Sequence, residues 1–201
     1  MLQDSWVVER RLGRGGMGSV YLAYDRTLDR KGAIKVLAAE LASAAEFGTR
    51  CEREARTTAQ LEHPNVVPVY AVGRHGSRPF LVMKHLEGVT LSALLADRGK
   101  IDQDLTVQIM TQVCGGVALI HSRGAVHRDI KPGNIMMSPD GHVTILDFGV
   151  TRSASGDRIT RAGTMIGTPE YMAPEQVTGK DVDHRSDIYS LGVVLFELLT
   201  G

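Results

Sequence analysis

The chain has 201 residues, enough for one large domain or for two small lobes around a shared cleft. Its apolar fraction of 43% and charged fraction of 23% are those of an ordinary soluble globular protein. The 23 Lys and Arg residues balance the 23 Asp and Glu residues, which argues against a nucleic-acid-binding protein and against one held to an anionic membrane by charge.

The two cysteines, Cys51 and Cys114, lie far apart and outside any C-x-x-C pattern. They predict small apolar core residues in a reducing compartment rather than a disulfide framework. The most apolar run, residues 188–199, contains Glu197 and is too short to cross a bilayer. We therefore expect a cytoplasmic segment without membrane contact, while a longer parent chain could carry a membrane anchor beyond residue 201.

The first eighty-odd residues predict an antiparallel sheet with one helix. A helix is expected from about residue 44 to 61, because Pro64 and Asn65 close it. Runs of alternating or continuous apolar residues predict the strands. They are expected at residues 6–8, 19–24, 33–37, 66–72 and 80–83.

After residue 90 the apolar residues change their period. From Leu105 to Val117 they recur every fourth position, which predicts a helix running to about His121. Two short strands are predicted at 135–137 and 143–146, joined by a turn. A composition shift near residue 88 thus indicates a sheet-rich lobe joined to a helical one.

A Ser/Thr/Gly-rich stretch, residues 151–168, precedes a final helix predicted from about Asp187 to Thr200. The apolar residues of this helix cover nearly every direction around its axis, so we expect it to be buried on all sides. One earlier helix in this lobe is too little cover, and we therefore expect the domain to be incomplete at its C-terminal end.

Three glycines, Gly13, Gly15 and Gly18, form a G-x-G-x-x-G spacing. A dinucleotide-binding unit would place a helix after them, but Ser-Val-Tyr-Leu-Ala-Tyr follows and suits a strand. A Walker A loop needs Gly-Lys-Ser/Thr, which is absent. The alternatives left by this motif are a hairpin flap over a nucleotide and a plain glycine-rich turn.

Four later motifs decide between these alternatives. In chain order they are Ala-Ile-Lys (33–35), His-Arg-Asp-Ile-Lys-Pro-Gly-Asn (127–134), Asp-Phe-Gly (147–149) and Gly-Thr-Pro-Glu-Tyr-Met-Ala-Pro-Glu (167–175). The ordered set resembles the signature of protein kinases over essentially the whole chain, and most of all the bacterial eukaryotic-like Ser/Thr kinases.

The resemblance implies an α+β, bilobal protein-kinase-like fold. The N-lobe, residues 1–83, would be an antiparallel sheet plus one helix, and residues 84–89 would form the hinge. Residues 90–201 would be a mostly helical, incomplete C-lobe.

The resemblance also implies an ATP site. The flap can offer backbone N–H groups to the phosphates because glycine has no Cβ to obstruct them. Leu12, Val20 and Ala33 would sandwich the adenine, and Met83 would be the gatekeeper. The implied ATP-binding residues are Leu12, Gly13, Arg14, Gly15, Gly16, Met17, Gly18, Ser19, Val20, Ala33, Lys35, Met83, Leu86 and Met136.

Lys35 is the candidate for the α/β-phosphate lysine, and such a lysine needs a carboxylate to hold it. Glu46, Glu52 and Glu54 all lie in the following predicted helix. We select Glu54, because it lies on a semi-apolar face and matches the family's position, whereas Glu52 lies on a solvated face with Arg56.

Asp129 is the implied catalytic base, and Lys131 would neutralise the γ-phosphate during transfer. Asn134 and Asp147 are the implied ligands of Mg²⁺, with Mn²⁺ as the alternative ion. His127 is expected to be a structural core residue, and Asp187 to hold the backbone of the catalytic loop.

Regulation is expected in the Ser/Thr-rich stretch. Arg128 precedes Asp129, the pattern of kinases that are activated by phosphorylation of this segment. Thr160 and Thr164 are the candidate phosphorylation sites, and Thr168 is expected to shape the substrate pocket. Gly32 departs from the family, which usually has Val there, and we expect it to loosen the third strand.

The predicted function is a Ser/Thr protein kinase that transfers the γ-phosphoryl group of Mg·ATP to protein hydroxyls. The alternatives are a nucleotide-binding pseudokinase scaffold and a small-molecule kinase. The expected partners are protein substrates and a transient second copy for phosphorylation in trans, with no nucleic acid.

Overall fold

A computed structural model describes residues 5–15, 18–38, 61–76, 78–147 and 169–201. The chain divides into two compact units. Among the described residues, the first unit comprises 5–38 and 68–85, and the second comprises 61–67, 86–147 and 169–201.

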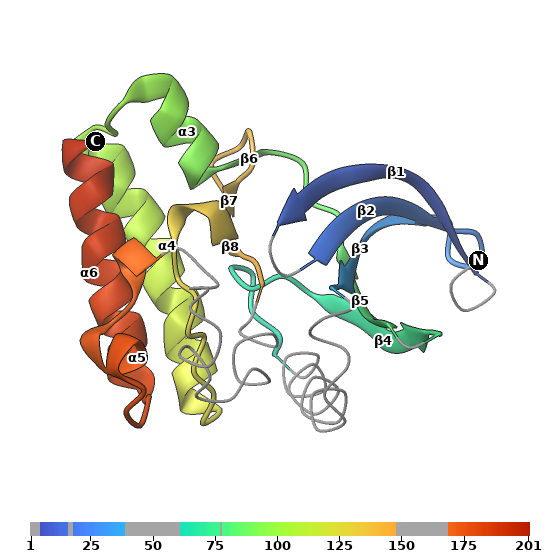
Figure 1. The fold of residues 1–201 in the computed structure, drawn as a ribbon. Helices are drawn as coiled ribbons and strands as arrows, with labels where there is room; N and C mark the ends of the chain where they lie inside the picture. The colour runs from blue at the N-terminus through green and yellow to red at the C-terminus, as the bar shows by residue number, and fades with distance from the viewer. Residues whose placement is uncertain (1–4, 16–17, 39–60, 77, 148–168) are drawn as a thin grey trace. The chain divides into compact units, whose positions relative to one another are not determined.

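The first unit is an antiparallel sheet of five strands in the order β1-β2-β3-β5-β4 (Figure 1). Each strand is hydrogen-bonded to its neighbours in this order. Strand β3 continues through Gly32, which pairs with Ala23 of β2 and with Lys84 of β5. The expected loosening at Gly32 is therefore wrong. The strands are β1 (Trp6–Gly15), β2 (Gly18–Asp25), β3 (Arg30–Leu37), β4 (Val69–His75) and β5 (Arg78–Lys84).

One face of this sheet carries the apolar core of the first unit. Trp6, Ala23, Ile34, Phe80 and Val82 are buried together there. Because successive side chains of a strand point to opposite faces, the residues between them, such as Ala33 and Lys35, lie on the other face.

The second unit combines helices with a small sheet in the order β6-β7-β8. Helices α4 and α6 pack against each other, and α4 also packs against β8 (Figure 1). The elements are β6 (Val89–Thr90), α3 (Leu91–Arg98), α4 (Gln103–Ser122), η1 (Pro132–Asn134), β7 (Ile135–Met137), β8 (Val143–Ile145), η2 (Pro169–Tyr171), α5 (Pro174–Thr178) and α6 (His184–Thr200).

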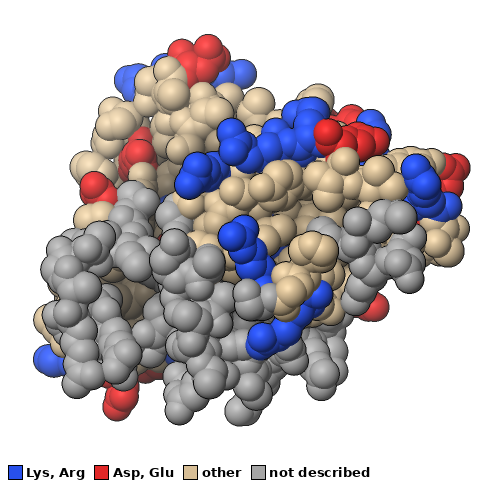
Figure 2. Space-filling model, turned by 45° about the vertical axis from the view of Figure 1, so that its right-hand side comes forward, with Lys and Arg blue, Asp and Glu red and all other residues tan. Residues whose placement is uncertain are grey.

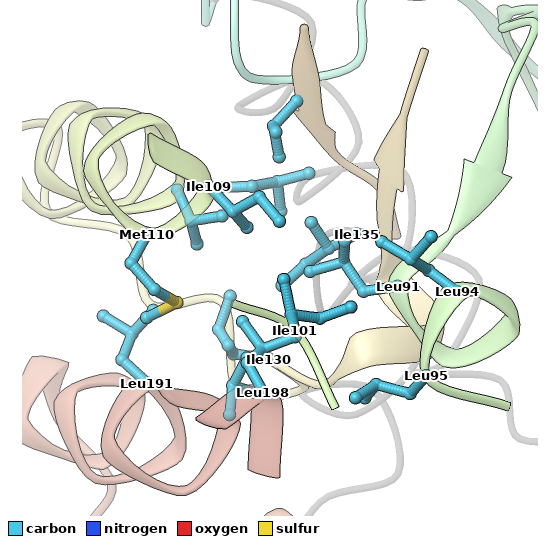
Figure 3. Close-up of a cluster of buried hydrophobic side chains, with 14 of the residues drawn as sticks. Leu91, Leu94, Leu95, Ile101, Ile109, Met110, Ile130, Ile135, Leu191 and Leu198 are labelled. Atoms are coloured by element: carbon cyan, nitrogen blue, oxygen red, sulfur yellow. The ribbon is translucent and has the colours of Figure 1, made fainter. Parts of the chain in front are cut away.

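Helices α3 and α4 begin where the sequence supplies side-chain caps. Thr90 accepts a hydrogen bond from the N–H of Ala93 at the start of α3, and Asp102 accepts one from Leu105 at the start of α4. Their apolar faces meet in one core, to which α3, α4, α6 and β7 all contribute (Figure 3). The labelled members include Leu91, Leu94, Leu95, Ile101, Ile109, Met110, Ile130, Ile135, Leu191 and Leu198.

Residues 61–67 belong to the second unit although they directly precede β4. Val66 forms a parallel bridge with Ile145, and Val67 donates its N–H to the carbonyl of Ile145. The predicted strand at 66–72 therefore starts three residues late, at Val69.

The prediction for Cys114 is wrong, because this cysteine is exposed rather than part of the core. Helix α6 is covered on one side, and its other side exposes Ile188, Tyr189, Leu195, Phe196 and Leu199, in agreement with the expectation that one earlier helix is too little cover. Among the described helices, α4 is long and apolar enough to span a membrane by length and hydropathy alone, and its residues Ile109, Met110, Val113 and Val117 pack in the core of the second unit.

On the face drawn in Figure 2, Lys and Arg side chains of the described residues form a row across the upper part, with Asp and Glu side chains at its right-hand end. Smaller basic groups lie below this row, and acidic side chains also lie at the edges. This distribution agrees with the balance of charges in the sequence.

Candidate active site

The glycine-rich stretch forms a hairpin between β1 and β2, in which Gly15 pairs with Gly18. Gly18 has a φ of +142°, and a Cβ there would come within 2.1 Å of the Val36 carbonyl oxygen. This glycine is therefore required by the fold itself. By contrast, a Cβ on Gly13 or Gly15 would meet nothing within 4 Å, so both glycines border open space.

The face of the sheet opposite the core brings several of the expected ATP-binding residues together. Val20 lies directly opposite Lys35, and Ala33 lies directly opposite Met83. Opposed residues of an antiparallel pair share a face, so these four side chains form one surface. Leu12 lies at a register shift between Arg11 and Gly13 and is 39% exposed.

Lys35 is buried, with 8% of its surface exposed. Its expected partner Glu54 lies outside the described residues, as do Gly16 and Met17 of the flap. The remaining flap residues, Arg14 and Ser19, pair with each other across the hairpin.

In the second unit, three predicted catalytic-loop residues form one hydrogen-bonded cluster. Lys131 Nζ lies 3.0 Å from Asp129 Oδ2 and 3.3 Å from Asp129 Oδ1. Asn134 Nδ2 donates to both the backbone carbonyl and Oδ2 of Asp129, each at 2.8 Å. The Asp129 carboxylate is thus held by two side chains of the same loop.

Asp147 is placed next to this cluster by the residue before it. Leu146 donates its N–H to the Asn134 carbonyl at 2.8 Å, and the Leu146 carbonyl lies 2.9 Å from His127 Nε2. Asp147 itself has a φ of +46°, in the left-handed region that non-glycine residues rarely adopt. Met136, on β7, and Leu86, just after β5, are both half-buried in the second unit.

Buried side chains hold the backbone of this loop. Asp187, 1% exposed, accepts hydrogen bonds from the N–H groups of His127 and Arg128 at 2.8 and 2.7 Å. This confirms the expectation for Asp187. His121 Nε2 lies 2.8 Å from the same carboxylate, and His127 is fully buried, as expected for a structural residue.

The chemistry of the donor set fits a divalent cation bound together with phosphates. Within the described part of the chain, no three His, Cys, Asp or Glu side chains cluster as a closed metal site. Asn134 and Asp147 offer the amide and carboxylate oxygens that Mg²⁺ prefers, and Mg²⁺ is usually bound by one or two protein oxygens plus phosphates and waters.

Residues 171–175, which belong to the last of the kinase-like motifs, are hydrogen-bonded to α6. Ser190 donates to the Tyr171 carbonyl, and the Tyr171 hydroxyl donates to Glu197. Burial, followed by this contact with Glu197, raises the pKa of Tyr171 well above its usual value. Ser186 donates to the Glu175 carboxylate, which lowers the pKa of Glu175.

Thr160, Thr164 and Thr168 lie outside the described residues. One buried residue near the site was missed by sequence reasoning. Gln176 donates a hydrogen bond to the Arg128 carbonyl at 2.9 Å. A Gln at the third position of a helix is typical of a capping box, which could have predicted its bond to the Ala173 N–H but not its contact with Arg128.

The comparisons with known proteins agree with this geometry. The family model described as "Protein kinase domain" matches residues 6–201. The chain is 43% identical over 201 residues to serine/threonine-protein kinase PknL of Mycobacterium bovis, and 42% identical over 206 residues to PknB of Mycolicibacterium smegmatis. All of the chain is covered in both cases, but it spans only 50% of the first relative and 33% of the second.

A solved structure, the kinase domain of Mycobacterium tuberculosis PknI, superposes with a TM-score of 0.82 and 30% identity. The match covers 97% of this chain and 74% of that one. The chain therefore belongs to the protein kinase family. Within that family it is similar to the bacterial eukaryotic-like Ser/Thr protein kinases.

Proposed function

We propose that the protein transfers the γ-phosphoryl group of Mg·ATP to Ser or Thr hydroxyls of proteins. The observation that carries this proposal is the cluster of Asp129, Lys131 and Asn134, in which one carboxylate is held by an ammonium and an amide. A pseudokinase would not need this arrangement, and Lys35 and Asp147 are both present as well.

Each group has a separate task in this proposal. Asp129 orients the substrate hydroxyl and accepts its proton, and Lys131 neutralises charge on the γ-phosphate. Lys35 holds the α- and β-phosphates. Asn134 and Asp147 would hold Mg²⁺, which would supply positive charge against the negative charge that develops on the phosphates.

The hydrogen bonds favour these tasks. Because Asn134 Nδ2 is committed to Asp129, its Oδ1 is the atom suited to a cation. Because Lys131 Nζ lies against the Asp129 carboxylate, its ammonium group is close to any phosphoryl group that approaches a hydroxyl bound by Asp129.

The test is a transfer assay on the full-length protein with Mg²⁺, labelled ATP and a generic protein acceptor, followed by mapping of phosphorylated sites by mass spectrometry. Asp129→Asn should lower kcat by about 10²–10⁴-fold, and Lys35→Met should abolish transfer. Asp104→Asn, at the exposed start of α4, is the matched control and should leave kcat unchanged. Binding of ATP by the wild type without any transfer would instead establish a pseudokinase.

We further propose that activation involves phosphorylation of Thr160 or Thr164 in trans, during transient self-association. Incubating active protein with a size-tagged Asp129→Asn copy should place phosphate on the inactive copy. Phosphate confined to the active copy at every protein concentration would contradict phosphorylation in trans.

A further inference from the structure

The side chain of Gln176 connects α5 to the catalytic loop through two different atoms. It is 8% exposed. Its Oε1 accepts a hydrogen bond from the Ala173 N–H at 3.0 Å, and its Nε2 donates to the Arg128 carbonyl at 2.9 Å. The first bond caps its own helix, and the second reaches a residue 48 positions earlier.

The Arg128 residue that it reaches has a costly backbone conformation. Its φ is +66°, which non-glycine residues adopt only when their surroundings impose it. Its N–H donates to Asp187 Oδ1 at 2.7 Å, and its carbonyl accepts from Gln176. Arg128 is therefore held by two buried side chains. Asp187 of α6 binds its N–H group, and Gln176 of α5 binds its carbonyl group.

The peptide group that follows Arg128 leads directly to Asp129. It consists of the Arg128 carbonyl and the Asp129 N–H, and that N–H points to His127 Nδ1 at 3.3 Å. The peptide plane is thus fixed at its oxygen by Gln176 and at its nitrogen by His127. A rotation of this plane would move the Asp129 side chain, because the Cα of Asp129 is attached to it.

We propose that Gln176 is a positioning residue for phosphoryl transfer, which sets the Arg128–Asp129 peptide and thereby the direction of the Asp129 carboxylate. This inference rests on the proposed kinase activity. Gln176 contacts the loop backbone and no reacting group, so its loss should lower kcat and leave the KM values for ATP and protein acceptor nearly unchanged.

The substitution Gln176→Glu separates the two hydrogen bonds. A glutamate retains the oxygen that accepts from Ala173 but replaces the donating Nε2 with a second oxygen. When ionised it faces the Arg128 carbonyl with a negative charge, and when protonated it can donate an O–H to that carbonyl. Activity lost at high pH should therefore return as the pH falls.

The experiment measures kcat and both KM values of the full-length protein between pH 5.5 and 8.5. At each pH, the kcat of the variant is divided by the kcat of wild type, so that pH effects common to both proteins cancel. The ionisable side chains near Gln176 and its partner, His127, Asp129, Lys131, Glu175 and Asp187, are the same in both proteins. At pH 8 we expect the kcat of Gln176→Glu to be about 10- to 100-fold below wild type. The ratio should rise towards one at low pH, with KM values within about twofold.

Two variants keep the result interpretable. Gln108→Glu makes the same change at an exposed position of α4, and its ratio should stay near one at every pH. Gln176→Met has the same length without a donor or a charge, so its kcat should be low at every pH. If Gln176→Glu does not fold, the kcat of Gln176→Met alone decides whether Gln176 is needed for transfer.

Wild-type kcat for both Gln176 variants at all pH values would overturn the inference, as would a loss confined to KM. A wild-type protein that transfers no phosphate would overturn the proposed function instead, and the positioning role with it. The two failures are therefore distinguishable.

Discussion

The indole ring of Trp6 lies where a side chain on Gly32 would begin. A Cβ on Gly32 would come within 2.5 Å of Trp6 Cζ3 and 2.7 Å of Cη2. Both residues are buried, and Arg30 lies beside Trp6 and over the ring of Tyr70 at 3.7 Å. The glycine that departs from the family pattern thus makes room for a tryptophan in the core of the first unit.

Replacing Gly32 with valine should destabilise the protein. The new side chain would collide with the Trp6 ring, and overpacking of this kind costs about 1–3 kcal/mol. Chemical denaturation measures the free energy of unfolding. The double variant Trp6→Leu with Gly32→Val should lose less free energy of unfolding than the sum of the two single variants. As a control, Gly192→Ala on α6 should be neutral or stabilising, because a Cβ there would meet nothing within 4 Å. Strict additivity of the double variant would contradict the collision.

Replacing Asn65 with aspartate should weaken the second unit. Asn65 Nδ2 donates to Gln112 Oε1 at 3.0 Å and to the Val143 carbonyl at 2.6 Å, and aspartate would present an acceptor to both. Leaving such buried groups unpaired should lower the free energy of unfolding by about 1–3 kcal/mol. Urea denaturation measures the free energy of unfolding of this variant and of Gln108→Glu, a control change at an exposed position of α4. Equal free energies of unfolding for the two variants would refute the expectation.

Replacing Asp187 with asparagine should impair both folding and transfer. The carboxylate accepts two backbone N–H groups and a contact from His121, and an amide can supply only one acceptor oxygen. We expect a loss of about 2–3 kcal/mol in stability, because hydrogen bonds to a charged group are involved, together with a lower kcat. Circular dichroism melts and the transfer assay measure the two effects, and wild-type values in both would show that the carboxylate is dispensable.

The contribution of Asp183 to stability should depend on pH. Hydrogen bonds and the charge of Arg185 lower the pKa of Asp183 to about 2. A carboxyl group with a lowered folded-state pKa stabilises the fold above its unfolded pKa of about 4 and loses this effect as the pH falls towards 2. The difference in unfolding midpoint between wild type and Asp183→Asn should therefore be constant above about pH 5 and shrink between about pH 4 and 2. A difference that does not change over this interval would contradict the assignment.

Regular patterns in the sequence predicted much of the fold. The alternation in β2 and the recurrence at every fourth position in α4 predicted elements close to those observed, because each pattern indicates one buried face. The continuous apolar run of β3 predicted a strand that is buried at consecutive positions. Helix α3 was not predicted. It has only eight residues, and its start depends on the Thr90 cap more than on periodicity.

Contacts between distant residues were less predictable. Asp187 could be expected from its motif, but Gln176 could not, because its partner Arg128 lies 48 residues away and the two meet only through packing of the second unit. The exposure of Cys114 was missed for a different reason. Cysteine is usually buried, but the position of Cys114 on α4 places it away from the apolar face of the helix.

The membership of residues 61–67 in the second unit has a consequence for synthesis on the ribosome. Asn65 binds the carbonyl of Val143, 78 residues further along. At roughly 5–20 residues per second, Asn65 precedes its partner by about 4–16 s. The apolar side chains of Leu61 and Val66 pack against Ile120 of α4 in the finished protein, so their cover is synthesised earlier, and the polar contact of Asn65 is completed only after this apolar one.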